Sequence, residues 1–344
     1  MSAGPSPLVS VLTPFYNTAP YLAECIESVL AQTRGDFEYL LVDNCSTDGS
    51  DDIAAGYAAR DPRIRFLRNE TFLTQLQNYN HALEAIAPHT RYVKIVQADD
   101  AIVPQCLADM IALAEAYPRV GLVSSFRLFG RRLYPRLGLS HTPFVMTGRE
   151  AGRLTLVDDF YMFGSQTTVM YRADIVRGRR PFYPEHSTFA DAEVALEIML
   201  DHDFGFVPQI LSFSRDDDAS TWGSVRSFDP ILLFEILALH RYGASFLTPD
   251  EHSAASAAHE KEYRRFLAEC WLRCFPPAFW DYHRAGLATI GRGLRRSDLV
   301  GPALAVAADY LLQPKTVGAA LLRRLRRRGA PPSSVEPDVR MGSA

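Results

Sequence analysis

Short apolar runs alternate with longer amphipathic stretches along the first part of the chain. Residues 8–12 form one such run, which is typical of a buried strand. The stretch that follows places Leu22, Cys25, Ile26 and Val29 on one face at helical spacing. Further strands are predicted at 39–42, 64–67, 92–96 and 120–126, and helices at 50–60, 73–87 and 104–117. Because strands and helices alternate, we expect an α/β fold whose mostly parallel sheet is covered by helices on both faces.

Turn and cap residues refine this picture, and the pattern changes after about residue 130. Asn17 or Thr18 is expected to cap the first helix, and Pro20 suits its first turn. The stretch 127–149 is rich in Arg, Pro and Gly, which predicts a loop over the functional site. Later elements are predicted as a strand at 167–171, a helix at 191–201, a strand at 206–214 and helices from Pro230 onward.

Composition indicates a soluble globular protein rather than a nucleic-acid or membrane-spanning one. The 344 residues are 47% hydrophobic and 22% charged, with a formal net charge of −4. A binder of nucleic acid usually carries a basic face, so we expect no nucleic-acid partner. Neither a signal peptide nor a membrane-spanning run is expected. The five scattered cysteines show no zinc-binding spacing, which favours a reducing, cytoplasmic compartment.

Polar residues follow three of the predicted strands. They occur at 13–17, at 43–48 and at 97–100, where the sequence reads Gln97-Ala98-Asp99-Asp100. The carboxyl ends of parallel strands share one edge of the sheet, and open α/β folds bind ligands at that edge. We therefore predict a site for a nucleotide diphosphate and a divalent metal, Mn²⁺ or Mg²⁺, since carboxylates are ligands for such ions.

The two adjacent aspartates are expected to have different roles. Successive side chains at a strand end point in opposite directions, so only one of them is expected to bind metal directly. We assign Asp100 to the metal and Asp99 to ribose or to a second metal contact. The alternative is a helix cap, because Pro104 begins a helix just beyond. Residues 43–48 have a similar alternative as turn and cap residues, with Asp48 or Ser46 the foremost candidates.

Asp191 is the candidate general base. It opens a predicted helix, where the helix dipole favours the ionised carboxylate. Glu193 lies two residues on and would face another direction. An acceptor hydroxyl must lose a proton during sugar transfer, and a carboxylate suits that task. The alternative for Asp191 is a helix-terminal charge with no further role.

The three polar clusters together resemble the family 2 inverting glycosyltransferases of the GT-A fold. The resemblance covers about residues 8–222 and includes Asn80, Asp191 and the segment 213–220. It implies that the donor nucleotide sugar is bound by Thr13, Pro14, Tyr16, Asn17, Asp43, Asn44, Asn80, Gln97 and Asp99, that Asp100 and Asp99 hold the metal, and that Asp191 is the base. It further implies inverting transfer of one sugar from a nucleotide-diphosphate sugar, with a UDP-sugar favoured, to a glycan or lipid-linked hydroxyl in surface polysaccharide or glycolipid synthesis.

Several positions depart from the family pattern. Gln97 stands where many relatives carry the first aspartate of Asp-x-Asp, Asn44 replaces an aspartate that often reads the base, and Ala190 replaces a glutamate. Three aspartates at 216–218 occupy a region where relatives often have a histidine. No Gln-x-x-Arg-Trp motif precedes Trp222, so a processive synthase is not expected. A non-catalytic sugar-nucleotide-binding or scaffold protein is the alternative function. A nucleotidyltransferase is disfavoured because no Gly-rich phosphate loop follows the first strand.

We expect a tail at 1–7, a GT-A domain at 8–225, a helical region at 226–328 and a disordered tail at 329–344. Within the domain, 8–126 would bind the nucleotide sugar and 127–225 the acceptor. Arg323–Arg328 includes five arginines, which suit contact with anionic lipid at the inner membrane face or, alternatively, a solvated helix end. An aromatic cluster is expected to form the core of the helical region, with an acceptor platform as the alternative: Trp271, Phe275, Phe279, Trp280 and Tyr282.

Overall fold

The computed structural model describes residues 7–135, 142–157, 162–215 and 228–312. The chain consists of two compact units, Met1–Ala257 and Ala258–Ala344. The membrane-contact prediction for Arg323–Arg328, the two predicted tails apart from Pro7, and Asp216, Ser220 and Trp222 lie outside the described residues.

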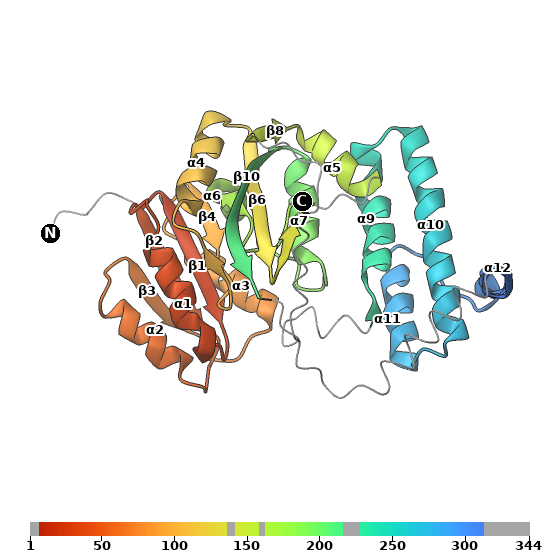
Figure 1. Cartoon of the computed structure of the whole chain (residues 1–344), viewed down its shortest axis with the longest axis horizontal. Coiled ribbons are helices and arrows are strands. Elements are labelled where there is room, and N and C mark those ends of the chain that lie inside the picture. Colours follow the sequence, from red (N-terminus) through yellow and green to blue (C-terminus); the bar gives the residue numbers. More distant parts are fainter. Residues whose placement is uncertain (1–6, 136–141, 158–161, 216–227, 313–344) are drawn as a thin grey trace, which may run out of the picture. The chain divides into compact units, whose positions relative to one another are not determined.

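The first unit is built on a ten-stranded sheet (Figure 1). Eight of the strands follow the order β3-β2-β1-β4-β9-β6-β10-β5, and the other two, β7 and β8, pair with β6 and β10. Its strands are β1 (Val9–Phe15), β2 (Phe37–Asp43), β3 (Ile64–Arg68), β4 (Tyr92–Ile95), β5 (Ala101–Ile102), β6 (Val120–Phe129), β7 (Arg132–Tyr134), β8 (Phe144–Met146), β9 (Met170–Arg172) and β10 (Asp203–Ser214). The first four strands are parallel, as predicted. The later part of the sheet is mixed, because β9 runs antiparallel to both β4 and β6.

Helices cover both faces of this sheet, each over its own hydrophobic core. One core contains buried residues of α1 (Ala19–Leu30), α2 (Ser50–Ala58) and α4 (Cys106–Ala116). The other contains those of α3 (Gln75–Glu84), α5 (Gly148–Val157), α6 (Ala173–Gly178), α7 (Ala190–Met199) and α9 (Ile231–Phe246). Alternate strand residues serve the two cores: Leu12 belongs to the second, Val11 to the first. The predicted α/β architecture, covered on both faces, is confirmed.

The first helix begins as predicted, but its cap comes from elsewhere in the chain. Thr18 is the N-cap residue of α1, yet its side chain makes no capping hydrogen bond. Instead, Ser50 Oγ accepts from the Thr18 amide at 2.9 Å, and a carboxylate oxygen of Asp48 accepts from the Ala19 amide at 2.9 Å. Asp48 also accepts from the Ser50 amide, so one carboxylate satisfies amides at the starts of both α1 and α2.

The prediction of a loop across 127–149 is wrong for the described part of that stretch. Strand β6 continues to Phe129, β7 and β8 follow, and α5 begins at Gly148. Phe129 and Tyr134 meet edge to face with ring centroids 6.1 Å apart, which stabilises the β6–β7 pairing. Strands of three residues are too short to show a periodicity, so the Arg, Pro and Gly content dominated the prediction.

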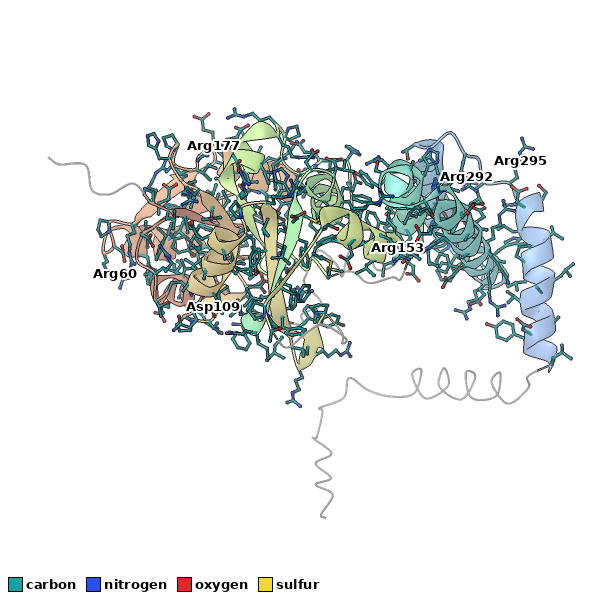
Figure 2. The ribbon with its side chains drawn as sticks, turned by 90° about the horizontal axis from the view of Figure 1, so that it is seen from above. Arg60, Asp109, Arg153, Arg177, Arg292 and Arg295 are labelled. Carbon is teal, nitrogen blue, oxygen red and sulfur yellow. The ribbon has the colours of Figure 1, made fainter. Side chains whose placement is uncertain are left out.

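Helices α5 and α6 were not predicted, and polar contacts fix both. Arg153 of α5 pairs with Glu251 at 2.7 Å, and Arg177 of α6 donates to the carbonyls of Ala87 and Thr90 at 2.8 and 2.9 Å (Figure 2). The hydrogen-bond partners of both arginines are far away in sequence. Such contacts leave no local signal for a prediction.

The second unit is helical. It contains the later part of α10 (Pro249–Leu272), α11 (Pro277–Ala288) and α12 (Ser297–Leu312). Phe279 is fully buried among Phe266, Phe275, Trp280 and His283, so this member of the predicted aromatic cluster is a core residue. The other four members, Trp271, Phe275, Trp280 and Tyr282, are half-buried. No helix within the described ranges is long and apolar enough to cross a bilayer.

A buried lysine joins β4 to the segment that precedes β9. Lys94 is fully buried, and its ammonium donates to the carbonyls of Thr167 and Val169, the latter at 3.1 Å. Burial lowers the pKa of Lys94, with the charge of Cys106 and Asp100 opposing that effect. The lysine therefore fixes the position of Thr167.

Replacing Lys94 by Met is expected to destabilise the protein by about 2 kcal/mol or more, because two buried carbonyls lose their donor. Urea unfolding measures the change. Lys261→Met, at an exposed lysine of α10, is the matched control. An unchanged free energy of unfolding for Lys94→Met would contradict this role of the lysine.

Candidate active site

The topology brings five chain segments to one edge of the sheet. Strands β2, β1 and β4 are parallel, and β6 runs in the direction of β4 because both are antiparallel to β9. Strand β10 is parallel to β6. The carboxyl ends of β1, β2, β4, β6 and β10 therefore share one edge, where the predicted clusters at 13–17, 43–48 and 97–100 lie.

Thr13 and Pro14 are buried at this edge. The Thr13 hydroxyl donates to the carbonyl of Val96 at 2.9 Å and lies 2.9 Å from the hydroxyl of Tyr39. Its hydrogen bonds thus connect β1 with β2 and with the end of β4. Thr13 shapes the floor of the edge, and its side chain has no exposed surface for a ligand.

Tyr16 and Asn17 emerge above this floor. Tyr16 is 46% exposed. Asn17 has a left-handed backbone with φ of 49°, its amide donates to Ser46 Oγ at 3.0 Å, and its side-chain oxygen accepts from the Thr47 amide at 2.9 Å. The loops after β1 and β2 are therefore bonded to each other, so the two nucleoside-binding clusters predicted from the sequence lie side by side.

Asp43 and Asn44 are both buried, and both hold neighbouring loops. One carboxylate oxygen of Asp43 accepts from the Ser46 amide at 2.9 Å, and the other lies 3.3 Å from Arg68 Nε. The Asn44 side-chain oxygen accepts from Asn69 Nδ2 at 3.0 Å and from the Leu73 amide at 2.9 Å. Asn44 Nδ2 donates to the Leu73 carbonyl at 2.8 Å. The side-chain amide group of Asn44 is thus directed to the loop before α3.

The acidic cluster follows β4. Gln97 Nε2 donates to the Tyr79 hydroxyl at 3.3 Å, and the Gln97 amide donates to the Thr167 hydroxyl at 3.0 Å. Asp99 is partly exposed, and its carbonyl accepts from Arg215 Nε at 3.0 Å. The two aspartates therefore differ in environment, as the alternation of side chains predicts.

Asp100 is only 5% exposed, and Ser214 Oγ donates to its carboxylate at 3.1 Å. Burial raises the pKa of Asp100 to about 6, and the negative charge of Asp99 adds to this shift. Hydrogen bonds from Thr167 and Ser214 and the positive charge of Arg127 act in the opposite direction. The carboxylate is consequently ionised at neutral pH, which a metal ligand requires.

The donor set fits a hard cation that a substrate completes. Within the described ranges, no group of three or more His, Cys, Asp and Glu residues is placed to enclose a metal ion. Mg²⁺ is usually held by one or two carboxylates together with substrate phosphates, and oxygen ligands suit Mn²⁺ equally. The pair Asp99 and Asp100 matches that arrangement.

Asp191 lies in the first turn of α7. One of its carboxylate oxygens accepts from the Ala192 amide at 2.9 Å. Desolvation raises the pKa of Asp191, while hydrogen bonds from the backbone and the charge of Arg127 oppose the rise. Burial raises the pKa values of Tyr171 and Tyr183, whose hydroxyls lie 3.4 Å apart, and the negative charge of Asp191 adds a smaller contribution. A carboxylate with a raised pKa is suited to accept a proton.

Two neighbours of Asp191, Ala190 and Glu193, make packing contacts and hydrogen bonds within the protein. Ala190 is 3% exposed and packs in the core. Glu193 accepts from Ser187 Oγ at 2.6 Å and pairs with Arg241 of α9, so it faces away from Asp191 as predicted. Glu197 pairs with Arg179 and accepts from Tyr242, so Asp191 remains the candidate base of this helix, and the charge of Arg127 acts on it.

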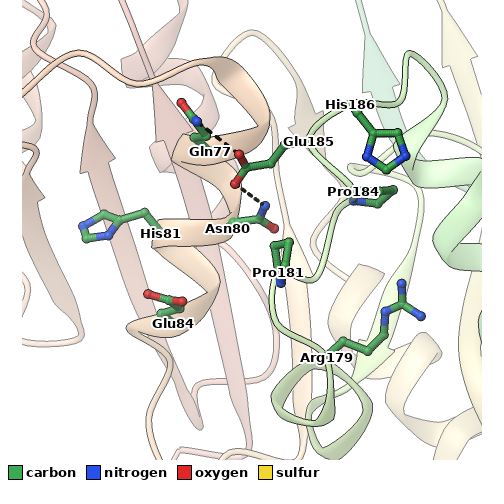
Figure 3. A pocket seen from close by; sticks show the side chains of 9 residues that line it. All are labelled: Gln77, Asn80, His81, Glu84, Arg179, Pro181, Pro184, Glu185 and His186. Carbon is green, nitrogen blue, oxygen red and sulfur yellow. Dashed lines mark hydrogen bonds between the residues drawn. The ribbon is translucent and has the colours of Figure 1, made fainter.

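Asn80 holds a segment rather than facing the acidic pair. Its side-chain oxygen accepts from the Tyr183 amide at 2.8 Å, and its Nδ2 donates to the Tyr183 carbonyl at 2.9 Å. Asn80 and Glu185 line an open pocket of 770 Å³ between α3 and the segment 179–186 (Figure 3). None of Asp99, Asp100 and Asp191 lines this pocket, so we place the chemistry at the sheet edge instead.

Arg127 is a site residue that the sequence did not indicate. Its guanidinium donates to Ser165 Oγ at 2.7 Å and lies over the rings of Phe129 and Tyr134. In the sheet it pairs with Ser212, two residues before the Ser214 that contacts Asp100. Its charge acts on both Asp100 and Asp191. Its position in an Arg-, Pro- and Gly-rich stretch concealed it, because that stretch was interpreted as a loop.

Comparison with known proteins gives consistent matches. Residues 10–178 match the sequence profile described as glycosyl transferase family 2. The chain is 38% identical over 97 residues to glycosyltransferase GlyG of Streptococcus pneumoniae, covering 28% of this chain and 32% of that protein. It is 30% identical over 225 residues to the uncharacterized protein MT1568 of Mycobacterium tuberculosis, covering 62% and 69%. For TuaG of Bacillus subtilis, a protein named for teichuronic acid biosynthesis, the identity is 40% over 94 residues, covering 27% and 36%.

Two of these relatives are thus matched over about a third of their length. Solved structures extend the likeness to most of the chain. TarS 1–349 of S. aureus, in complex with UDP-GlcNAc, has a TM-score of 0.59 at 16% identity, covering 88% of this chain and 91% of that one. The mannosyltransferase PcManGT of Pyrobaculum calidifontis, in complex with GDP-Man and Mn²⁺, has a TM-score of 0.52 at 18% identity, covering 90% and 81%. These likenesses confirm the predicted GT-A fold, and the sequence matches confirm the predicted family. The chain belongs to glycosyl transferase family 2.

Proposed function

We propose that this protein transfers one sugar per encounter from a nucleotide-diphosphate sugar to an acceptor hydroxyl, with inversion at the anomeric carbon. The observation that carries the proposal is that the charge of Arg127, which pairs with Ser212 near the end of β10, acts on the carboxylates of both Asp100 and Asp191. Asp100 would hold the metal that neutralises the leaving diphosphate, and Asp191 would take the proton of the acceptor hydroxyl. Inversion needs a single in-line displacement, for which one base is enough.

The donor would occupy the edge from β2 to β4. The nucleoside would lie against Tyr16, Asn17 and the loops held by Asp43 and Asn44, and the diphosphate would lie at Asp99. TarS and PcManGT, solved with UDP-GlcNAc and with GDP-Man, have the same fold, which supports a nucleotide-sugar donor. We favour a UDP-sugar.

Asp100, with Asp99, would hold Mn²⁺ or Mg²⁺, which neutralises charge on the departing diphosphate when bound. The Mn²⁺ complex of PcManGT supports this part of the proposal. Arg127 would add a positive charge that acts on both carboxylates. Asp191 would accept the proton of the acceptor hydroxyl while that oxygen attacks.

The acceptor would be a glycan or a lipid-linked saccharide in surface polysaccharide or glycolipid synthesis. The name of TuaG supports this class of pathway. Contact of Arg323–Arg328 with the inner face of the membrane stays a prediction. The alternative, a non-catalytic sugar-nucleotide-binding or scaffold protein, is favoured by the use of Gln97 and Ala190 in packing and internal hydrogen bonds.

Replacing Asp191 by Asn separates these two functions. A base variant is expected to lose sugar transfer by about 10²-fold or more, because general-base catalysis contributes that much. Its affinity for the nucleotide is expected to stay at the wild-type level, as measured by calorimetry. Asp201→Asn, at an exposed aspartate just after the same helix, is the control and is expected to retain activity. Full transfer by Asp191→Asn would exclude Asp191 as the base.

The pH dependence of transfer is expected to show an acidic limb above the usual range of an aspartate. The reason is that the raised pKa of Asp191 keeps the carboxyl protonated, and inactive as a base, up to a higher pH. Arg127→Met is expected to move this limb to higher pH, since the arginine charge lowers the pKa of Asp191. Donor binding measured over the same pH range separates this effect from protonation of Asp100. Arg132→Met, at an exposed arginine of β7, should leave the limb unmoved.

Thermal unfolding with UDP-, GDP- and dTDP-sugars tests whether donor binding requires a divalent metal. Stabilisation is expected with one nucleotide class, and only when Mn²⁺ or Mg²⁺ is present, at about 2.7 kcal/mol when the ligand is at 100 times its Kd. Asp100→Asn is expected to lose the metal-dependent part. Equal stabilisation in EDTA would argue against a metal at Asp99 and Asp100.

A further inference from the structure

Two aromatic rings from distant parts of the chain meet at the nucleoside end of the sheet edge. Tyr16 follows β1 and Phe72 precedes α3, and they are 46% and 61% exposed. Their centroids lie 4.8 Å apart with an interplanar angle of 66°, an edge-to-face pair. Single exposed aromatics are ordinary on protein surfaces. A pair assembled from two loops, beside the ends of β1 and β2, is a more specific feature.

The loop that carries Phe72 is held by a network of asparagines. Asn44 makes two hydrogen bonds with the backbone of Leu73, the residue next to Phe72. Asn69 Nδ2 donates to Asn44 and to Asn78 at 3.0 and 2.8 Å, and the Asn69 amide donates to the Asp43 carbonyl at 2.9 Å. The segment 69–73 is thereby bonded to the end of β2, on both sides of Phe72.

The backbone that carries Tyr16 is fixed in the same way. The next residue, Asn17, makes hydrogen bonds with Ser46 and Thr47 in the loop after β2. Both exposed rings therefore project from anchored backbones, which lowers the conformational entropy that binding would cost. Beneath them, Asp43 is fully buried and Asn44 is 3% exposed.

We propose that Phe72 is a base-stacking residue of the nucleotide site, paired with Tyr16, and that Asn44 acts as a positioning residue by holding the loop of Phe72. This inference rests on the proposed donor class. Every nucleobase has an apolar π-face, and exposed, immobilised aromatic rings are suited to cover it. An edge-to-face pair leaves ring surface free for a base to stack on.

The strand order supports this location. Strand β1 lies between β2 and β4, and neighbouring strands are about 4.8 Å apart. The loops after β1 and β2 therefore neighbour the acidic cluster that follows β4. A base at Phe72 and Tyr16 would have its diphosphate on the side of the edge where Asp99 lies.

Asn44 has little capacity left to read a base. Its side-chain oxygen accepts two hydrogen bonds, and one of its two N–H groups is bonded to Leu73. Its contribution to nucleotide binding is therefore expected to pass through the loop rather than through direct contact. That distinction is measurable by comparing Asn44 and Phe72 variants singly and together.

Calorimetric titration of the full chain with UDP, GDP and dTDP, each in Mn²⁺, identifies the nucleotide that the wild type binds. Phe72→Ala is expected to weaken the affinity for that nucleotide by about 5- to 150-fold, the range of one base–aromatic stack. Phe72→Tyr is expected to restore most of it. Inorganic pyrophosphate in Mn²⁺ should bind Phe72→Ala as it binds the wild type, because it has no base.

Tyr117→Ala is the matched control, since Tyr117 is 50% exposed and lies at the C-terminal end of α4, away from the carboxyl edge. Thermal melting of Phe72→Ala is expected to equal that of the wild type because the ring is largely exposed. Asn44→Ala is expected to weaken nucleotide binding, and to add little when Phe72 is already Ala.

The outcomes separate the two proposals. Wild-type affinity in Phe72→Ala would overturn the stacking role, as would an equal loss for nucleotide and pyrophosphate. An Asn44→Ala effect that is undiminished in the Phe72→Ala background would overturn the positioning role of Asn44. A folded wild type that binds none of the three nucleotides would instead overturn the proposed function, and this inference with it.

Discussion

The site depends on one buried contact, the hydrogen bond from Ser214 to the carboxylate of Asp100. Asp100 follows β4, Ser214 ends β10, and the residues just after Asp100 form β5, which pairs with β10. This contact therefore connects the parallel part of the sheet with the mixed part. The predicted nucleotide-binding cluster and the acidic cluster are on the first part, and Arg127 is on the second. Strand pairs β4–β9 and β9–β6 already join the two parts, and this contact adds a side-chain link at the edge where the candidate site residues lie.

Beneath that contact, buried polar groups replace the usual apolar packing. Lys94 fixes the carbonyls of Thr167 and Val169, and the Thr167 hydroxyl accepts from the Gln97 amide and bonds to Asp100. Each member satisfies another, so the cost of burying them is offset. The same burial raises the pKa of Asp100 and of Asp191. A positive charge at Arg127 opposes both shifts and therefore favours the ionised form of each carboxylate.

The sequence predicted those parts of the structure that local patterns determine. The strands β1 to β4 and helix α1 follow from apolar spacing, since Leu22, Cys25, Ile26 and Val29 are all buried. The meeting of three polar clusters at one edge follows from parallel topology. The partners of individual side chains could not be predicted in this way. Asn44, Asn80 and Lys94 make hydrogen bonds with backbone 29, 103 and 73 residues away, and no local signal specifies such distances.

Asn44 shows how a departure from a family pattern changes the structural question. In the sequence it replaces an aspartate associated with reading the base, which suggests a loss of nucleotide contact. In the structure its neutral amide accepts and donates at once, as a carboxylate could not, and it holds both polar groups of the Leu73 backbone. The exchange from acid to amide therefore removes one kind of base contact and stabilises a loop with an exposed aromatic ring. Recognition by a charged hydrogen-bond acceptor depends on the identity of the base, whereas stacking tolerates any base. Residue 44 should accordingly contribute little to the base preference of this chain, because its side-chain amide is engaged by the Leu73 backbone and by Asn69.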